Sequence, residues 1–292
     1  MNSQINNISD TLKDLYEPIA PELVLVEQGL ENQIKLIAEN HEKLVERHLY
    51  LKDVIRQLSL MRGKLLRPAL VLLCGKIVGS ELTTELVSMA IASELVHAAS
   101  LIHDDIIDNA ITRRARKALY REFGISIAVL VGDVLYAQFF TLITELNLSS
   151  EARLRLMQLF CAVTKRMSQG EIFQHGIKRY KIEPTVEDYL VIIKSKTASL
   201  MEACCAAGAL VGGGTNRQVK EASDFGCQFG LVFQLIDDQM DKDQQVATGA
   251  NGDKNAAIKA AYKSLETFPE SEAKISLINL ITVVISQTTS SR

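Results

Sequence analysis

An all-α fold, built as one large helical bundle, is what the sequence predicts, and three observations support it. Apolar residues recur at helical spacing through most of the 292 residues. The five prolines fall between the predicted helices, where they act as breaks. Strand-like alternation and Asn-Gly or Asp-Gly turns between β-rich runs are missing. No linker or repeat period divides the chain, so we expect a single domain over residues 1–292.

The individual helices follow from the spacing of apolar residues, taken in chain order. Pro68 and Pro184 each suit the first turn of a helix, where a missing N–H costs nothing. Three glycines at 212–214 end one long helix before the next begins, and Pro269 should break the last one. The predicted helices lie at about 21–39, 42–60, 68–78, 81–108, 124–146, 149–177, 184–211, 215–243 and 253–288.

Composition and charge exclude several classes of protein. Hydrophobic residues make up 47% of the chain and charged residues 23%, which is normal for a soluble protein with a large core. A net charge of −3 without a basic run does not suggest a nucleic-acid partner. The five cysteines are an odd number without framework spacing, so we expect buried free thiols rather than disulfides.

The localisation expected from the sequence is cytoplasmic. The polar N-terminus lacks the basic-then-apolar pattern of a signal peptide. The nearest match to a membrane span is 125–144, but Gly132, Asp133 and Gln138 interrupt its apolar run. We therefore interpret this segment as a buried core helix and expect no membrane span.

Two acidic clusters of the form D-D-x-x-D each end a long apolar helical pattern. Residues four apart lie on one face of a helix, so the first and last aspartates of each cluster should point together. Carboxylates this close repel one another, and oxygen-only ligands suit a hard cation such as Mg²⁺. One such cluster is often a solvated helix end, but two are harder to explain in that way. The predicted metal ligands are Asp104, Asp105 and Asp108 in the first cluster and Asp237, Asp238 and Asp241 in the second.

Basic residues near the first cluster suggest what the metal ions would help to bind. Lys64 and Arg67 come just before a predicted helix, and Arg113 and Arg114 lie in the loop 109–123 after the cluster. Metal ions bridging phosphate oxygens, with basic side chains on the remaining oxygens, are what a diphosphate requires. For the other basic residues of this loop a solvated or salt-bridging role is favoured.

The chain resembles the all-trans isoprenyl (polyprenyl) diphosphate synthases from about residue 63 to residue 241. The resemblance depends on an ordered set of motifs rather than on any one of them, and it is closest to the long-chain, hexa- to octaprenyl members. The motifs are G-K-x-x-R-P at 63–68, H-A-x-S-L-I-H-D-D-x-x-D at 97–108, R-R at 113–114, F-G at 123–124, G-D at 132–133, Q-G-E at 169–171, K-T-A at 196–198 and F-Q-x-x-D-D-x-x-D at 233–241.

This resemblance implies a helical bundle of the isoprenoid synthase type, with a deep central cavity and usually as a homodimer. It implies about three Mg²⁺ ions per active site and a head-to-tail addition of isopentenyl diphosphate to an allylic diphosphate. Asp104, Asp105, Asp108, Lys196, Asp237 and Asp238 would be the catalytic set. Matching positions assign isopentenyl diphosphate to Lys64, Arg67, His97 and Arg114, and the allylic diphosphate to Arg113, Lys196, Thr197 and Gln234.

Product length is argued from the residues just before the first cluster. Ala99 and Ser100, with Ala92 and Ser93 further from the metals, are small and leave room for a growing chain. Short-chain members of the family place an aromatic residue at this level, so we expect a long product of about six to eight isoprene units. Small residues also permit close helix packing, and another helix could still close the cavity.

The chain departs from the family pattern in three places. The loop after Arg114 lacks the usual glycine and Pro-Thr pair. The segment 248–253 has Ala250 at a position where the family carries lysine, for which Lys242 or Lys254 could substitute. The region after about residue 245 is expected to be shortened by roughly fifty residues relative to the family.

Two other functions remain open at this point. A terpene cyclase, or a head-to-head condensing enzyme, shares metal-dependent ionisation on a similar bundle. A non-catalytic or regulatory subunit of a heteromeric prenyl diphosphate synthase would fit the shortened C-terminal region, so a heterodimer is possible as well as a homodimer.

Overall fold

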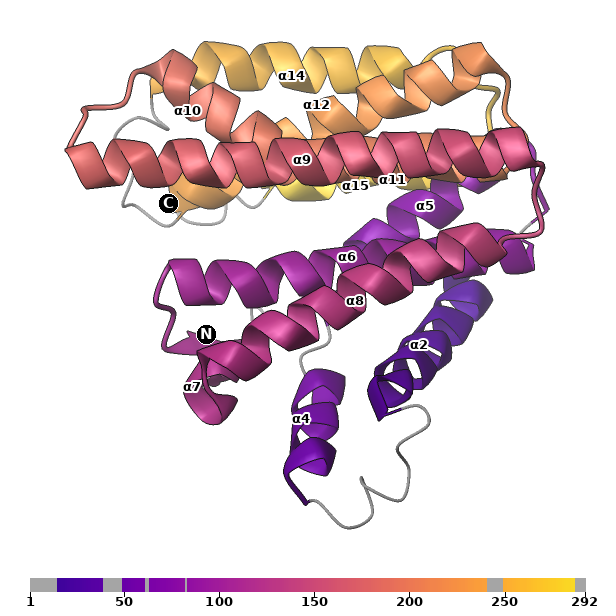
Figure 1. Ribbon diagram of the computed structural model, residues 1–292. Coiled ribbons are helices and arrows are strands. Elements are labelled where there is room, and N and C mark those ends of the chain that lie inside the picture. Colours follow the sequence, from indigo (N-terminus) through magenta and orange to yellow (C-terminus); the bar gives the residue numbers. More distant parts are fainter. Residues whose placement is uncertain (1–14, 39–48, 61–62, 82, 241–248, 287–292) are drawn as a thin grey trace.

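The computed structural model describes residues 15–38, 49–60, 63–81, 83–240 and 249–286, and in these the chain is a helical bundle (Figure 1). The tail of the helix predicted at 215–243, with Asp241, and the start of the one predicted at 42–60 fall outside these residues. The longer helices are α2 (Ala20–Lys35), α4 (Leu49–Leu60), α5 (Leu66–Ile77), α6 (Thr84–Ile107), α8 (Ile125–Glu145), α9 (Ser150–Tyr180), α11 (Ser199–Val211), α12 (Asn216–Met240), α14 (Asn251–Leu265) and α15 (Glu272–Ser286).

Shorter elements join these helices. The 3₁₀ turns η1 (Glu17–Ile19) and η2 (Leu36–Ala38) flank α2. The elements α7 (Leu119–Phe123) and α10 (Val186–Ile193) are short helices, and the π-helical segment η3 (Lys194–Ala198) connects α10 to α11. Strands β1 (Thr112–Arg113) and β2 (Arg116–Lys117) pair antiparallel, with Thr112 opposite Lys117.

Helix α11 lies at the centre of the bundle, packed against α5 on one side and α12 on the other. It is rich in alanine, glycine and cysteine, so backbones approach closely. A Cβ placed on Gly208 would lie 2.1 Å from the carbonyl oxygen of Val71 in α5. Only glycine fits this contact, and the resulting core is dense, with Phe225 and Phe229 of α12 fully buried and stacked.

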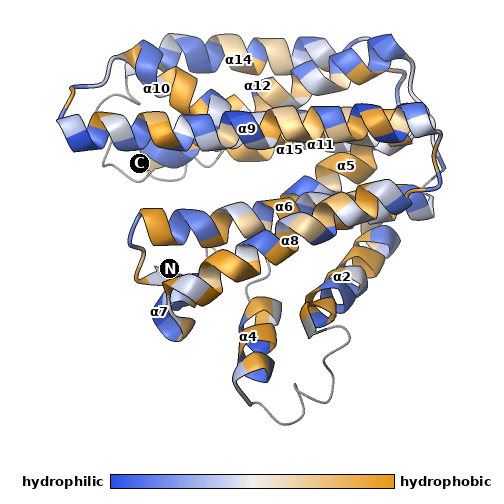
Figure 2. Cartoon of the chain, in the orientation of Figure 1, coloured by the Kyte–Doolittle hydropathy of each residue, from blue (hydrophilic) through white to orange (hydrophobic). Residues whose placement is uncertain are grey.

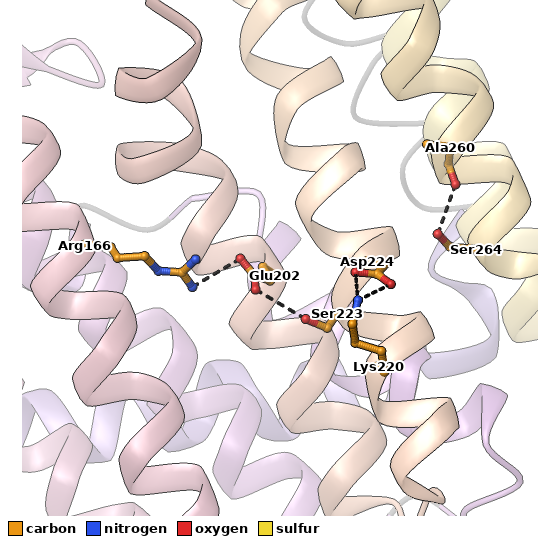
Figure 3. Close-up of polar contacts among 7 residues, drawn as sticks. All are labelled: Arg166, Glu202, Lys220, Ser223, Asp224, Ala260 and Ser264. Atoms are coloured by element: carbon orange, nitrogen blue, oxygen red, sulfur yellow. Dashed lines mark hydrogen bonds and ion pairs between the residues drawn. The ribbon is translucent and has the colours of Figure 1, made fainter. Parts of the chain in front are cut away.

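A polar network ties three helices together beside this core (Figure 3). Glu202 of α11 accepts from Arg166 of α9 at 3.2 Å and from Ser223 of α12 at 3.4 Å. Lys220 and Asp224 form a further ion pair one turn apart on α12. Because Glu202 contacts both neighbours, α9 is held against the α11–α12 pair, and α9 carries residues of the candidate site nearer its C-terminal end.

The structure confirms the all-α prediction and corrects several details. The predicted helix 184–211 is three pieces, α10, η3 and α11. Its first residue is capped by Thr185 in a capping box with Asp188, so Pro184 precedes the cap rather than occupying the first turn. The short β1–β2 ribbon and α7 were not predicted. Their sequences are too short to show a period, and the turn at Arg114 and Ala115 adopts positive φ without glycine.

Helix α8 is not the buried core helix that the sequence suggested. Helices α6 and α8 are both long and apolar enough to cross a membrane, but the same is true of core helices, and only α6 is mostly buried. Hydrophobic residues recur along α8 (Figure 2), and one apolar face is exposed to solvent. That face includes Ile125, Val129, Leu130 and Val134.

The cysteines also differ in part from the expectation. Cys74, Cys204 and Cys205 are buried at the α5–α11 contact as free thiols, whereas Cys161 is exposed on α9. The error arises because Cys161 follows an apolar residue in sequence but points away from the core.

Candidate active site

The first acidic cluster forms the C-terminal end of α6, and its three carboxylates have different surroundings. Asp105 is buried and accepts from Arg113, whose Nε lies 2.9 Å from Oδ1. Asp108 is exposed and forms an ion pair with Lys178 of α9 at 3.3 Å. Asp104 is half-buried and forms no hydrogen bond or ion pair with another side chain of the described residues. In this cluster the middle carboxylate, Asp105, is paired with an arginine inside the fold, whereas Asp104 and Asp108 lie nearer the surface.

Burial raises the pKa of Asp104 to about 6, and Glu171 and Asp108 nearby add to this shift. Lys196 and Arg113 oppose it. A half-buried carboxylate with acidic neighbours is the environment in which a bound cation would stabilise the ionised form.

Lys196 reaches this cluster from the π-helical segment η3. It forms an ion pair with the buried Glu171 of α9 and donates to Gln174 Oε1 at 2.6 Å. A Cβ on Gly170 would lie 2.7 Å from the Cβ of Ser195, so glycine allows α9 and η3 to approach closely. The extra residue of a π turn shifts the register of this segment, as is frequent at functional sites.

The second acidic cluster connects to the same segment. Thr197 donates to Gln234 Oε1 at 2.9 Å, and Gln234 Nε2 donates to Asp238 Oδ1 at 2.9 Å. Tyr189 of α10 donates to Asp238 Oδ2 at 2.5 Å. Asp237 is exposed at the end of α12. The structure therefore joins Thr197, Gln234 and Asp238, whereas the neighbouring Lys196 contacts α9 and lines one cavity with Asp104.

The predicted isopentenyl diphosphate residues form a separate basic cluster. Arg67 Nη1 lies 2.9 Å from His97 Nε2, and the Nε of Arg67 is buried without a partner in the described chain. Burial and the neighbouring arginines hold the pKa of His97 well below its usual range, so the ring is neutral and accepts from Arg67. Lys64 is exposed at the edge of this cluster.

Glu94, one turn before His97 on α6, is a member of this cluster that the sequence did not reveal. It is 9% exposed, and burial raises its pKa while Arg67 and Arg114 lower it. The charge of the Glu94 carboxylate in turn acts to raise the pKa of Arg67 and of Arg114, against the lowering by burial. Glu94 is therefore the internal counter-charge of a basic pocket, and it was overlooked because it lies in an apolar helix without a diphosphate-type motif.

One cavity lies at the basic cluster around His97, and another lies at the first acidic cluster. A small one of about 60 Å³ is lined by Glu94, His97, Arg113 and Arg114 with apolar residues of α2, α4 and α6. A larger one of about 220 Å³ has Asp104, Glu171 and Lys196 at one end. Ser100, Met167 and Ser168 line it about one turn before these carboxylates on α6 and α9, and Tyr136 lines it from α8.

The larger cavity corrects the argument about product length. Ser100 lines it as expected, but Ala99, Ala92 and Ser93 are fully buried in the core. An aromatic residue does line the cavity, because Tyr136 of α8 lies against it and stacks on His103, next to Asp104, at 6.1 Å between ring centroids. The sequence placed no aromatic residue here, since Tyr136 comes from a different helix.

The donor set fits a metal ion that is bound together with a diphosphate. Among the described residues, no three His, Cys, Asp or Glu side chains lie close enough to hold a metal ion by themselves. Mg²⁺ is commonly bound by one or two carboxylates, with water and substrate phosphates as its other ligands. Asp104 and Asp108, four residues apart on one helix face, supply such a partial set.

Comparisons with known proteins identify the family and the fold. A family model described as Polyprenyl synthetase matches residues 48–256, which is more than two thirds of the chain. A prenyl transferase of Cyanophora paradoxa is 35% identical over 218 residues, which are 73% of this chain and 65% of that protein. An octaprenyl diphosphate synthase of Haemophilus influenzae is 35% identical over 179 residues, 61% of this chain and 52% of that protein. The chain spans about half to two thirds of these relatives.

Solved structures share the fold. A geranylgeranyl pyrophosphate synthetase from Pyrococcus horikoshii has a TM-score of 0.82 at 21% identity, covering 94% of this chain and 98% of that one. A polyprenyl synthase from Caulobacter crescentus, complexed with calcium and isoprenyl diphosphate, has a TM-score of 0.80 at 21% identity, covering 94% and 97%. With the fold shared and the matched segment containing both acidic clusters and the basic residues between them, the chain belongs to the polyprenyl synthetase family.

Proposed function

We propose that this chain is a Mg²⁺-dependent prenyltransferase that adds isopentenyl diphosphate head-to-tail to an allylic prenyl diphosphate. The observation that carries the proposal is the 220 Å³ cavity, which has Asp104 and Lys196 at one end and Ser100 further in. A carboxylate and an ammonium group at the rim suit a metal-bound diphosphate, and the interior suits its hydrocarbon chain.

Asp104, Asp108 and Asp237 are the candidate Mg²⁺ ligands, with Asp241 as a further prediction outside the described residues. Bound Mg²⁺ would supply the positive charge that stabilises a departing diphosphate. Lys196 would then exchange its contacts with Glu171 and Gln174 for a diphosphate oxygen. Thr197 and Gln234, fixed by their mutual hydrogen bond, would orient the same group.

The basic pocket suits the second substrate. Arg67 has a buried Nε without a partner in the described chain and so offers a donor that a diphosphate oxygen would satisfy. Neutral His97 accepts from Arg67 and orients its guanidinium. Arg114 and Lys64 add charge at the exposed side. Two diphosphate sites, one metal-assisted and one arginine-lined, favour condensation of two substrates over cyclisation of one.

Product length is the finer part of the proposal. A long-chain product of about six to eight units stays a prediction, and Tyr136 and Met167 would have to turn aside to admit it. The relatives carry names that include geranylgeranyl, octaprenyl and solanesyl diphosphate synthase, which supports polyprenyl synthesis without choosing a length.

A homodimer is proposed from the exposed apolar face of α8. Ile125 and Leu130 are each more than half exposed there, although α8 packs its other face on α6. Exposed contiguous apolar residues on a helix commonly mark an interface. Sedimentation of the purified chain would report a dimer, and a monomer would contradict this part of the proposal.

Turnover tests the main proposal. The purified protein is incubated with Mg²⁺, labelled isopentenyl diphosphate and farnesyl or geranyl diphosphate, and the products are sized after dephosphorylation. A ladder of longer prenols is expected from the wild type and from Asp53→Asn, an exposed control on α4. Asp104→Asn should lose at least a hundredfold in rate. Cyclic hydrocarbons would favour a cyclase, and no turnover would favour a non-catalytic subunit.

A further inference from the structure

Both carboxylate oxygens of Asp238 accept hydrogen bonds from within the fold. Tyr189 donates to Oδ2 at 2.5 Å, and Gln234 donates to Oδ1 at 2.9 Å. The Tyr189 side chain comes from α10, 49 residues earlier, and is only 6% exposed. A buried phenol aimed at a carboxylate forms a charge-assisted hydrogen bond, which is about twice as strong as a neutral one.

These contacts continue to the allylic site. Gln234 uses its amide nitrogen on Asp238, so its oxygen is turned toward Thr197, whose hydroxyl donates to it at 2.9 Å. The chain of contacts therefore joins α10, the π-helical segment η3 and α12. Because an amide has one donor end and one acceptor end, fixing Asp238 also fixes which way Gln234 points.

The neighbouring residue Asp237 has a different position. Consecutive residues are about 100° apart around a helix, so the side chain of Asp237 leaves α12 in another direction, and it is exposed. The first cluster shows the same division, since the middle aspartate Asp105 is buried on Arg113 while Asp104 and Asp108 share the outer face. In both clusters the second aspartate faces the fold.

We infer that Tyr189 is a positioning residue: its phenol anchors Asp238, and Asp238 in turn holds Gln234 and Thr197 in place for the allylic diphosphate. Asp238 then acts as an internal anchor rather than as one of the Mg²⁺ ligands proposed above, which in this cluster include Asp237. This inference depends on the proposed function, because it names how the allylic site of that enzyme is built. It changes the metal-ligand role expected for Asp238 from its motif.

The test is Tyr189→Phe, which removes one hydroxyl and keeps the ring. The matched control is Tyr120→Phe, since Tyr120 is also buried but its hydroxyl has no partner in the described chain. We expect the KM for the allylic substrate to rise about tenfold in Tyr189→Phe, the loss typical of one hydrogen bond to a charged group. The KM for isopentenyl diphosphate should stay within twofold, and the control should match the wild type.

Direct binding separates positioning from catalysis. Calorimetric titration with Mg²⁺ and farnesyl thiodiphosphate, which resists ionisation, should show about tenfold weaker binding for Tyr189→Phe. Adding Tyr189→Phe to Asp238→Asn should weaken binding little further, because both changes break one network. Counting bound Mn²⁺ by electron paramagnetic resonance with the analogue present should show one ion fewer in Asp237→Asn and no loss in Asp238→Asn.

Each outcome decides the matter. Unchanged analogue binding by Tyr189→Phe, an equal rise in both KM values, or loss of an Mn²⁺ ion only in Asp238→Asn overturns the inference while the proposed function stands. A wild-type chain that neither binds the analogue nor turns over overturns both.

Discussion

If the chain elongates prenyl diphosphates as proposed, replacing Tyr136 by alanine should lengthen the product, because its ring lines the cavity proposed to hold the hydrocarbon chain. Ser100 is one turn before Asp104 on α6, and Met167 is one turn before Glu171 on α9, so these side chains mark the end away from the carboxylates. Tyr136 enters from α8, where it stacks on His103, the residue before Asp104. Under the proposed function, a hydrocarbon chain that extends from Asp104 toward Ser100 and Met167 has to pass Tyr136.

The size of the effect follows from the cavity volume. The cavity measures about 220 Å³. If each carbon with its hydrogens fills roughly the 30 Å³ that a water molecule occupies, a five-carbon unit needs about 150 Å³. The cavity thus holds about one to two units, and removing seven heavy atoms of the phenol frees space for about one more. Tyr136→Ala should lengthen the main product by one or more isoprene units.

The assay is liquid chromatography with mass spectrometry of the dephosphorylated products at limiting allylic substrate. Phe140→Ala is the control, because it removes an aromatic ring from α8 one turn further on without opening this cavity. Ser100→Phe should act in the opposite direction and shorten the product. An unchanged product distribution in Tyr136→Ala, or equal lengthening in Phe140→Ala, would refute the steric argument.

Three further predictions concern charge and packing. Burial raises the pKa of Asp104 to about 6 from 3.8, so between these pH values the folded state binds a proton that the unfolded state releases. The stability of the metal-free protein should therefore fall as the pH rises from about 4 to about 6. Asp104→Asn should flatten the profile of Tm against pH, measured with EDTA present. Lys178→Ala should lower the Mg²⁺ concentration needed for half-maximal turnover, because Asp108 loses a competing cation. The Tm should stay nearly constant, since exposed ion pairs contribute at most about 1 kcal/mol. A higher Mg²⁺ requirement would contradict this prediction. Gly208→Ala should lower the free energy of unfolding in urea by about 1–3 kcal/mol, because it overpacks the α5–α11 contact. Gly176→Ala has open space at its Cβ and should raise the free energy of unfolding by up to about 1 kcal/mol. Equal effects would show that the α5–α11 contact relaxes without strain.

Much of the site could be predicted because its signals are local. The aspartates at 104 and 108 share a helix face through their spacing alone, whatever surrounds them. His97 lies two turns before Asp104 on the same helix, and it contacts Arg67; the substrate role predicted for these two residues stays a prediction. The helix boundaries near Pro269 and the glycines at 212–214 were also correct, since proline and glycine act on their own backbone.

The partners of these residues could not be predicted in the same way. Glu171 belongs to the Q-G-E motif, but that motif does not indicate Lys196 as its partner. Gln174 and Glu94 belong to no motif that was recognised, although they lie beside Lys196 and the arginines. The π-helical segment that carries Lys196 lies close to α9 at Gly170, and the sequence shows no period that would indicate it. Such contacts depend on how separate helices meet.

The sequence by itself determined the fold class, the two acidic clusters and the basic residues around them, because periodicity and spacing act within one helix. Only the tertiary structure decided that Asp105 and Asp238 face inward, that Tyr136 stands in the cavity, and that α8 exposes an apolar face. The physical reason is that the direction a side chain takes on its helix is local, whereas the group that it meets there belongs to another helix many residues away.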